Sequence, residues 1–204
     1  VRIAKADWEK WKNTQALQKI RDEDKTILLS VPIQNPYFQS NFFNNKVSII
    51  ESMLSIQQNL PEELYVDRYV FSLDTVLGYY GFNLKRMGAF SVTIGAESDD
   101  KEMLMSRLLE LYGLEEIEFY SKIDWEEYHE YALISIIGVD NGLRQVKYDV
   151  LEKFKKKEIH AVLISLTEAE LKAISEEVKS YLTIVSKVFL ETEMADIYLL
   201  RKDG

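Results

Sequence analysis

One short loop holds residue types that can present a side chain and backbone amides to a bound group. The segment Ser30-Val31-Pro32-Ile33-Gln34-Asn35-Pro36-Tyr37-Phe38 follows an apolar run and contains two prolines, an asparagine and two aromatic residues. A stiff loop after a strand is a common place for binding residues in α/β proteins. The alternative is a rigid connection in which the asparagine satisfies local backbone groups, and the loop alone leaves both interpretations open.

Most other catalytic and metal-binding signatures are absent from the sequence. There is no cysteine, and the two histidines, His129 and His160, stand far apart. Neither has a second histidine three or four positions away, so we expect no metal site. No glycine-rich phosphate loop, serine nucleophile elbow or zinc-protease motif is recognised. The aromatic run at 79–82 is typical of core packing, with stacking on a ligand ring as the alternative.

Charge is unevenly distributed along an acidic chain. The 204 residues include 25 Lys+Arg and 34 Asp+Glu, which gives a net charge of −9 at pH 7. One basic cluster nevertheless comprises Arg144, Lys147, Lys153, Lys155, Lys156 and Lys157. Such a cluster can contact nucleic-acid phosphates even though the whole protein is acidic, and any binding of nucleic acid by it should be weak and salt-sensitive. The alternative is a solvated helix end at which lysines complement the helix dipole.

The composition is that of a globular protein. Hydrophobic residues make up 47% and charged residues 29% of the chain, which excludes disordered and low-complexity scaffolds. No apolar run approaches the ~20 residues needed to span a bilayer, and residues 1–12 lack a signal-peptide pattern. We therefore expect a cytoplasmic protein without a membrane partner. Its length predicts one domain over 1–204, with an N-terminal helix in 1–25 and a core over 26–204.

Short apolar runs alternate with amphipathic helical patterns, which is typical of α/β folds. Strands are predicted at 26–31, 65–73 and 116–120, a further alternating segment at 90–94, and a strand or link at 159–165. Helices are predicted at 4–22, 43–57, 99–113, 125–137, 143–157 and 167–190, with a short helix or turn at 74–82. The expected fold is a single three-layer, Rossmann-like α/β domain with a mainly parallel sheet. Its core should include Ile27, Leu29, Val70, Phe71, Ile117, Phe119, Leu171 and Ile174.

The loop at 30–38 resembles the corresponding loop of the tRNA-dependent cyclodipeptide synthases. Their pattern is Gly-x-Ser-x-x-Asn-x-x-aromatic, and its serine accepts the aminoacyl group from a charged tRNA. The four defined places of this pattern are held here by Ser30, Pro32, Asn35 and Phe38. The asparagine and the aromatic residue match, whereas Pro32 has no hydroxyl group with which to carry an acyl group.

A second likeness to this family lies nearer the C-terminus. The family has a Tyr-x-x-x-Glu motif in its final helix. In this sequence Tyr181 matches the tyrosine of the motif, whereas Val185 stands at the position of its glutamate. The resemblance implies aminoacyl transfer from aminoacyl-tRNA, with Ser30 and Tyr181 as catalytic residues and with no metal or organic cofactor. Substrate binding would fall to Asn35, Tyr37 and Phe38. Binding of the tRNA would fall to Arg144, Lys147, Lys155, Lys156 and Lys157.

Two departures from the family favour an alternative hypothesis. Pro32 cannot act as the nucleophile, and Val185 cannot move a proton at the amine. A non-catalytic Rossmann-type module that binds a protein partner fits these departures and the net acidity. The two hypotheses differ in one structural expectation. Ser30, Asn35 and Tyr181 should converge on an open pocket in the enzyme, and should be separated or packed away in the module.

Overall fold

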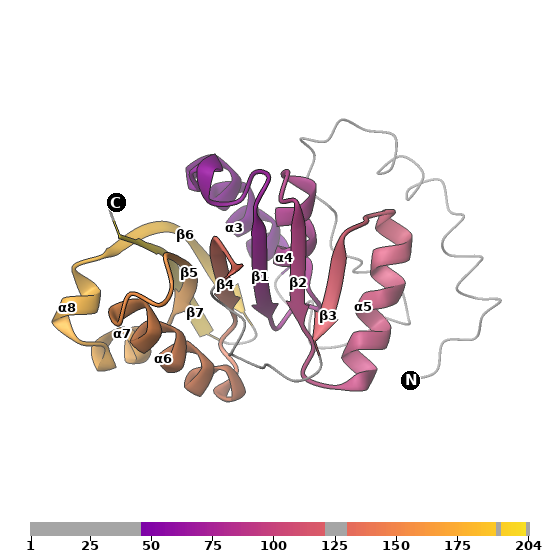
Figure 1. Ribbon diagram of the computed structural model, residues 1–204. Helices are drawn as coiled ribbons and strands as arrows, with labels where there is room; N and C mark the ends of the chain where they lie inside the picture. The colour runs from indigo at the N-terminus through magenta and orange to yellow at the C-terminus, as the bar shows by residue number, and fades with distance from the viewer. Residues whose placement is uncertain (1–45, 121–129, 191–192, 203–204) are drawn as a thin grey trace.

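Seven strands of the described residues form one sheet in the order β3-β2-β1-β4-β5-β7-β6 (Figure 1). The computed structural model describes residues 46–120, 130–190 and 193–202. The strands are β1 Tyr69–Asp74, β2 Ser91–Gly95, β3 Ile117–Tyr120, β4 Leu133–Ile137, β5 Ala161–Leu166, β6 Leu182–Leu190 and β7 Glu193–Arg201. The first five strands pair in parallel, and β7 lies antiparallel between β5 and β6. The predicted mainly parallel sheet is confirmed.

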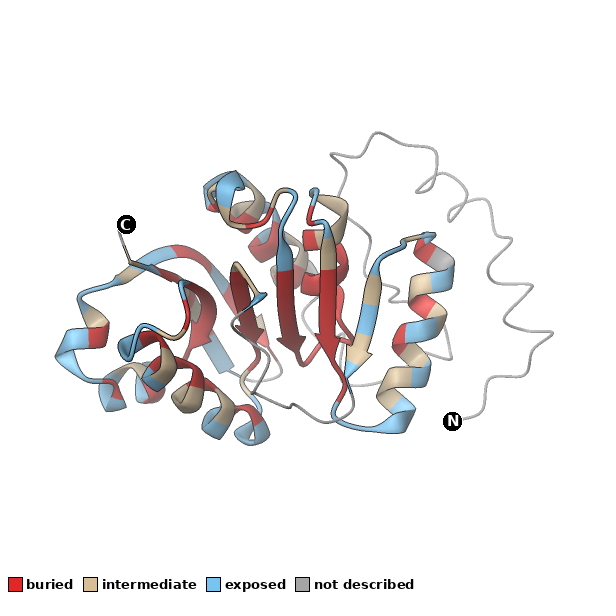
Figure 2. Ribbon diagram, in the orientation of Figure 1, coloured by how far each residue is buried: buried red, intermediate tan, exposed pale blue. Residues whose placement is uncertain are grey.

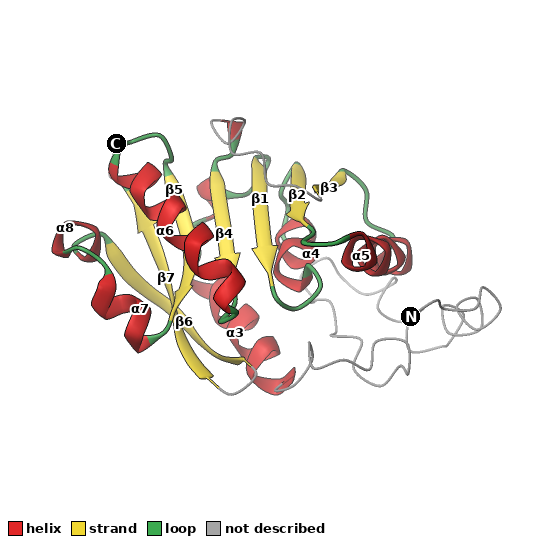
Figure 3. Cartoon of the chain, turned by 90° about the horizontal axis from the view of Figure 1, so that it is seen from below, coloured by secondary structure: helices red, strands yellow, loops and turns green. Residues whose placement is uncertain are grey.

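Helices cover both faces of this sheet (Figure 3). Their bounds are α3 Lys46–Asn59, α4 Tyr79–Arg86, α5 Asp99–Tyr112, α6 Asn141–Lys155, α7 Glu168–Ala173 and α8 Glu176–Lys179, with a 3-10 turn η3 at Glu62–Leu64. Buried side chains of α3, α4 and α5 join the core on one face, and those of α6 and α8 join the core on the other. This is the predicted three-layer α/β arrangement. No helix of the described ranges is long and apolar enough to cross a membrane.

The central strands are buried on both faces, as parallel strands between helical layers are (Figure 2). Every residue of β4 and β5 is buried, whereas the edge strand β3 has no fully buried residue. Among the predicted core residues, Val70, Phe71 and Ile174 are buried. Three others are only partly buried, namely Ile117, Phe119 and Leu171. Ile27 and Leu29 lie outside the described residues, as do the predicted elements at 4–22 and 26–31.

Two predicted helices are wrong. Residues 133–137, assigned to a helix over 125–137, form β4. A short run in which only Ser135 is polar has no clear period, so it does not distinguish a buried strand from a buried helix. The long helix predicted over 167–190 is replaced by α7, α8 and then β6. Its first turn was placed correctly, since the side chain of Thr167 and the side chain of Glu170 form a capping box.

Hydrogen bonds join α3 to the edge strand β6. Ser55 donates to the carbonyl of Val185 at 2.8 Å, and the backbone nitrogen of Phe189 donates to the hydroxyl of Ser48 at 2.7 Å. The hydroxyl of Ser186 donates in return to the carbonyl of Ser52 at 3.0 Å. The polar stripe of α3 therefore satisfies backbone groups of β6, while its apolar stripe enters the core.

Candidate functional site

The order of the strands reverses between β1 and β4. From β1 the chain continues to β2 and β3 on one side, whereas β4 is followed by β5 on the other side. In open α/β sheets, ligands bind beyond the carboxyl ends of the strands at this switch point. Three connections meet there, namely the turn at 75–78 after β1, residues 96–98 after β2 and the loop at 138–140 after β4.

Asp74, the last residue of β1, organises the turn that follows. Its Oδ1 accepts hydrogen bonds from the backbone nitrogens of Val76 at 2.8 Å and Gly78 at 2.9 Å, and its Oδ2 accepts one from Tyr80 at 3.0 Å. Burial raises the pKa of Asp74 to about 6, although these three hydrogen bonds act in the opposite direction. A carboxylate of the protein itself therefore occupies the anion position of this turn.

The turn follows the nucleotide-binding pattern Gly-x-Gly-x-x-Gly at two of its three glycine places. Val76 stands at the first place, and Gly78 and Gly81 stand at the second and third. Gly78 has a φ of +77°, in the left-handed region that favours glycine. A Cβ on Gly81 would lie 3.0 Å from side-chain atoms of Ser72 and Ile94, so this glycine permits close packing of α4 on the sheet.

Glu97 follows β2 and is exposed. It stands 21 positions after Val76. In the nucleotide-binding pattern, an acidic residue about 20 positions after the glycines accepts hydrogen bonds from ribose hydroxyls. The carboxylate of Glu97 pairs with Lys101 in the first turn of α5. The positive charge of Lys101 also favours the ionised form of Asp74, so the ends of β1 and β2 are electrostatically linked.

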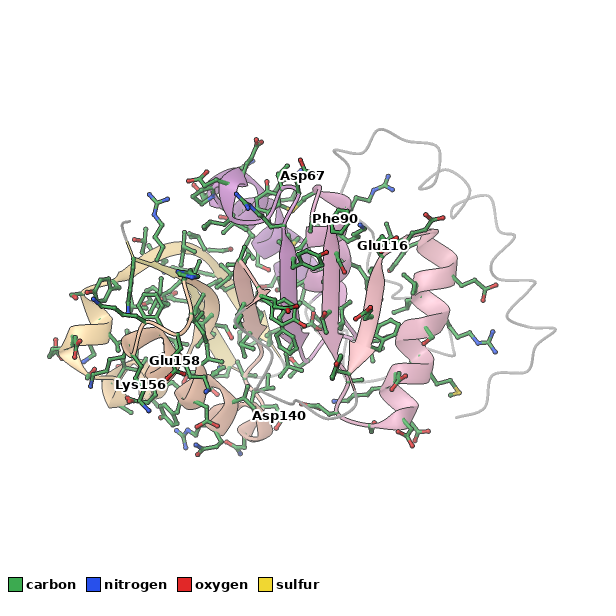
Figure 4. All side chains as sticks on the ribbon, in the orientation of Figure 1. Asp67, Phe90, Glu116, Asp140, Lys156 and Glu158 are labelled. Carbon is green, nitrogen blue, oxygen red and sulfur yellow. The ribbon has the colours of Figure 1, made fainter. Side chains whose placement is uncertain are left out.

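The loop after β4 is in direct contact with the turn after β1. A Cβ on Gly138 would lie 2.6 Å from Cγ2 of Thr75 and 2.5 Å from Cδ1 of Leu143, so glycine is required there. Asp140 begins α6 as its N-cap, and its Oδ1 accepts a hydrogen bond from the backbone nitrogen of Gly142 at 2.7 Å. Asp140 is exposed at the end of α6 opposite to Lys156 (Figure 4). The site therefore combines one buried and two exposed carboxylates.

This arrangement was missed in the sequence because the first glycine of the pattern is absent. The signal that was available is the combination of Gly78 and Gly81 after a strand with Glu97 after the next strand. The four loop residues predicted as site residues, Ser30, Asn35, Tyr37 and Phe38, lie outside the described residues. Their predicted roles are not tested by the fold.

Tyr181 lies in no helix, contrary to the predicted helix over 167–190. It is the residue before β6, it is exposed, and its ring packs edge-on against Phe154 of α6 with 5.5 Å between ring centroids. The geometry places this tyrosine against the last turn of α6, which also carries Lys153 and Lys155.

The predicted nucleic-acid-binding residues do not form one patch. Arg144 lies in the first turn of α6, whereas Lys155, Lys156 and Lys157 lie at its far end, about 18 Å away along the helix axis. All four are exposed, and Lys155 pairs with Glu177 at 3.6 Å. Lys147 is different, because it is buried and its ammonium group bonds inside the protein. Its side chain faces no solvent.

Solved structures share this fold, although no family model and no curated protein matches the sequence. One is a ribosomal protein L11 methylase from Lactobacillus delbrueckii subsp. bulgaricus, with a TM-score of 0.57 and 17% identity over 78% of this chain and 80% of that chain. A Pyrococcus horikoshii protein assigned as an RNA methyltransferase has a TM-score of 0.57 and 10% identity, over 93% and 97%. A Streptococcus pneumoniae protein assigned as a tRNA (m1A22) methyltransferase, solved with S-adenosyl-L-methionine, has a TM-score of 0.53 and 14% identity, over 74% and 72%.

The fold is that of the Rossmann-like methyltransferases. The likeness to cyclodipeptide synthases is therefore wrong, because the solved structures named above, which share this fold, are described as methyltransferases. Aminoacyl transfer from aminoacyl-tRNA is withdrawn with it, and the alternative of a non-catalytic module is not favoured by these neighbours. The likeness rested on the matches at Asn35, Phe38 and Tyr181, which are too few to identify a family. Methyltransferase-fold neighbours at these identities establish the architecture of the chain and no more.

Proposed function

We propose that this chain is an S-adenosyl-L-methionine-dependent methyltransferase that acts on RNA. The observation that carries the proposal is the turn after β1, in which Asp74 accepts three backbone hydrogen bonds. This turn lies at the switch point of a sheet shared with methyltransferases. The proposal replaces the expectation of no cofactor, which came only from the cyclodipeptide synthase likeness.

The turn discriminates between classes of nucleotide cofactor. In dinucleotide-binding proteins the backbone amides at the start of the first helix face a pyrophosphate. Here the amides of Val76, Gly78 and Tyr80 already donate to Asp74, and the carboxylate would repel a phosphate. S-adenosyl-L-methionine contains a ribose and a cationic sulfonium group but no phosphate. The residues present therefore fit a phosphate-free, positively charged nucleoside.

Two exposed carboxylates at the carboxyl ends of the strands would bind the cofactor and the substrate in this proposal. Glu97 would accept hydrogen bonds from the ribose hydroxyls, as the acidic residue after the second strand does in related sheets. Asp140 would accept a hydrogen bond from the amino group of the acceptor base and orient it toward the cofactor. The bound cofactor supplies an electrophilic methyl group. The negative charges of Glu97 and Asp140 favour the sulfonium cation over an anionic ligand.

Support for RNA as the substrate comes from two sources. Two of the three solved structures described above are assigned to RNA substrates, one of them to a tRNA. In addition, Arg144 and Lys155–Lys157 present cations at both ends of the exposed surface of α6. The second candidate is a protein substrate, because another solved neighbour is a methylase of a ribosomal protein.

Calorimetry tests the cofactor class first. We expect S-adenosylhomocysteine, the demethylated product, to bind to the purified protein, and NAD+ not to bind. Glu97→Gln should weaken binding about tenfold, the size of one hydrogen bond to a charged group. Lys172→Gln, on the exposed surface of α7, is the control. Absence of S-adenosylhomocysteine binding in the unaltered protein would contradict the proposal.

Methyl transfer decides the substrate. The protein is incubated with methyl-labelled S-adenosyl-L-methionine and, in parallel, with bulk RNA and with ribosomal proteins. Label in the RNA fraction supports the proposal. Label only in the protein fraction supports the second candidate and overturns RNA as the substrate.

A further inference from the structure

A buried ion pair lies behind the loop that follows β4. Lys147 of α6 and Glu170 of α7 are 1% and 6% exposed, and the Nζ of the lysine lies 3.0 Å from both carboxylate oxygens. Desolvation lowers the pKa of Lys147, and the neighbouring carboxylate of Glu170 acts in the opposite direction. Neither residue has a part in the proposed reaction. Their burial therefore needs another explanation.

The ammonium group of Lys147 has a third partner. It donates a hydrogen bond to the carbonyl of Gly138 at 2.7 Å, at the first residue after β4. The hydroxyl of Ser165 lies 2.9 Å from both the nitrogen and the oxygen of Gly138. Glu170 is fixed in turn, because it accepts a hydrogen bond from the backbone nitrogen of Thr167 at 2.9 Å. The network thus connects the loop after β4 to the start of α7.

Stability alone does not account for this network. Removing two charges from water costs several kcal/mol, and apolar residues of similar size often replace a buried ion pair without loss of stability. The specific result of the pair is the bond to Gly138. That glycine is also the point at which the loop after β4 touches Thr75 in the turn after β1.

We propose that Lys147 is a positioning residue, whose ammonium group, held by Glu170, fixes the carbonyl of Gly138 and thereby the loop at 138–141. This loop carries Asp140, which faces the acceptor base in the proposed function, and the catalytic part of the inference rests on that function. The structural part of the inference does not depend on the proposed function. It states only that the loop is held in one conformation from within the protein.

A double variant separates positioning from stability. Lys147→Met alone leaves the carboxylate of Glu170 buried without its cation, and should strongly destabilise the protein. In Lys147→Met/Glu170→Gln both charges are gone, and the glutamine oxygen can still accept from Thr167 as in a capping box. The double variant should therefore recover most of the melting temperature. It still lacks the ammonium donor, so the carbonyl of Gly138 keeps only the bond from the hydroxyl of Ser165.

Hydrogen exchange provides the readout that does not depend on activity. The amides of Gly138, Gly142 and Leu143 are bonded to Ser165, to the side chain of Asp140 and to its carbonyl, respectively. In the double variant these amides should exchange about tenfold faster, as expected for the loss of one hydrogen bond. The amides of β5 should be unaffected. Unchanged exchange at 138–143 overturns the proposal.

Kinetics complete the test. We expect kcat of the double variant to fall about 100-fold, the scale of a small misplacement at an active site, while KM for S-adenosyl-L-methionine changes little. Recovery of kcat together with the melting temperature would mean a purely structural role and would overturn the inference. The matched control is Lys172→Met/Glu168→Gln, an exposed pair of the same residue types in α7. If the unaltered protein binds no S-adenosylhomocysteine, the proposed function fails, and hydrogen exchange still decides the positioning.

Discussion

The carboxylate of Asp74 lies 2.9 Å from the backbone nitrogen of Gly78, so the strand end and the turn after it are joined by a side-chain bond. Two further amides donate to the same carboxylate. In place of a glycine at the first position of the turn, this protein uses an internal anion to hold the backbone.

Asp74→Asn should destabilise the protein at about pH 4, where the folded protein still holds the proton of Asp74. The amide oxygen of asparagine can accept the bonds from Val76 and Gly78, but its NH2 group cannot accept the bond from Tyr80. An unsatisfied buried backbone donor costs about 1–3 kcal/mol, which urea unfolding can measure. Asp140→Asn is the control, because asparagine is as good an N-cap as aspartate and the site is exposed. Equal losses in the two variants would contradict the role given to Asp74.

The stability of the protein should fall as the pH rises from about 4 to about 6 because of Asp74. Burial raises the pKa of this carboxyl from 3.8 to about 6, so in that window the folded protein holds a proton that the unfolded chain releases. Its contribution is greatest below pH 4 and is lost, by about 3 kcal/mol in total, above pH 6. Urea unfolding of the unaltered protein and of Asp74→Asn across this range isolates the effect. A stability difference between them that instead grows in favour of the aspartate above pH 6 would be inconsistent with it.

Gly138→Ala should disturb the site more than Gly142→Ala. A methyl group at Gly138 would lie within 2.6 Å of Thr75 and Leu143, so the loop after β4 or the turn after β1 must move. Overpacking of this kind costs about 1–3 kcal/mol. At Gly142 the nearest atom to an added Cβ is 3.4 Å away, and alanine favours the helix. Thermal unfolding and S-adenosylhomocysteine affinity should both decrease only for the first variant.

Replacing Lys155, Lys156 and Lys157 with alanine should weaken RNA binding to a similar degree for all RNA sequences. Contacts to phosphates carry no sequence information, and the logarithmic salt dependence should become shallower by roughly 0.7–0.9 per lost contact. Filter binding at low and moderate salt measures both quantities. Lys172→Ala/Lys179→Ala/Lys187→Ala, which removes the same number of charges outside the cluster, serves as the control for general loss of positive charge. Affinity and salt slope that do not change in the triple variant would remove this end of α6 from the interface.

The sequence predicts features that depend on residues close together in the chain better than features that depend on residues far apart. The capping box of Thr167 and Glu170 and the glycine end of α5 at Gly113 are local patterns, and both were placed correctly. The strand β4 was not predicted correctly, because its burial on both faces depends on helices distant in the chain. Lys147 was predicted to be exposed and to bind nucleic acid. Its burial is decided by Glu170, 23 positions later, which no pattern within α6 reports.

The candidate site was hidden for a related reason. The pattern of glycines is easy to recognise only when all of them are present, and here a valine replaces the first one. Here Asp74 stabilises the turn instead, because its carboxylate accepts hydrogen bonds from the amides two, four and six positions further along. An aspartate at the end of a strand is common, and only its geometry shows that it holds the turn.

The side chains of α3 that bond to β6 also bear on how copies of this protein behave toward one another. An uncovered edge strand is a template on which a second chain can extend the sheet. On β6 the carbonyl of Val185 and the nitrogen of Phe189 are already bonded to serines of α3. A growing intermolecular sheet would have to displace that helix and expose its apolar stripe to water. The serines of α3 thus leave two fewer backbone groups of this edge available to bond a second chain.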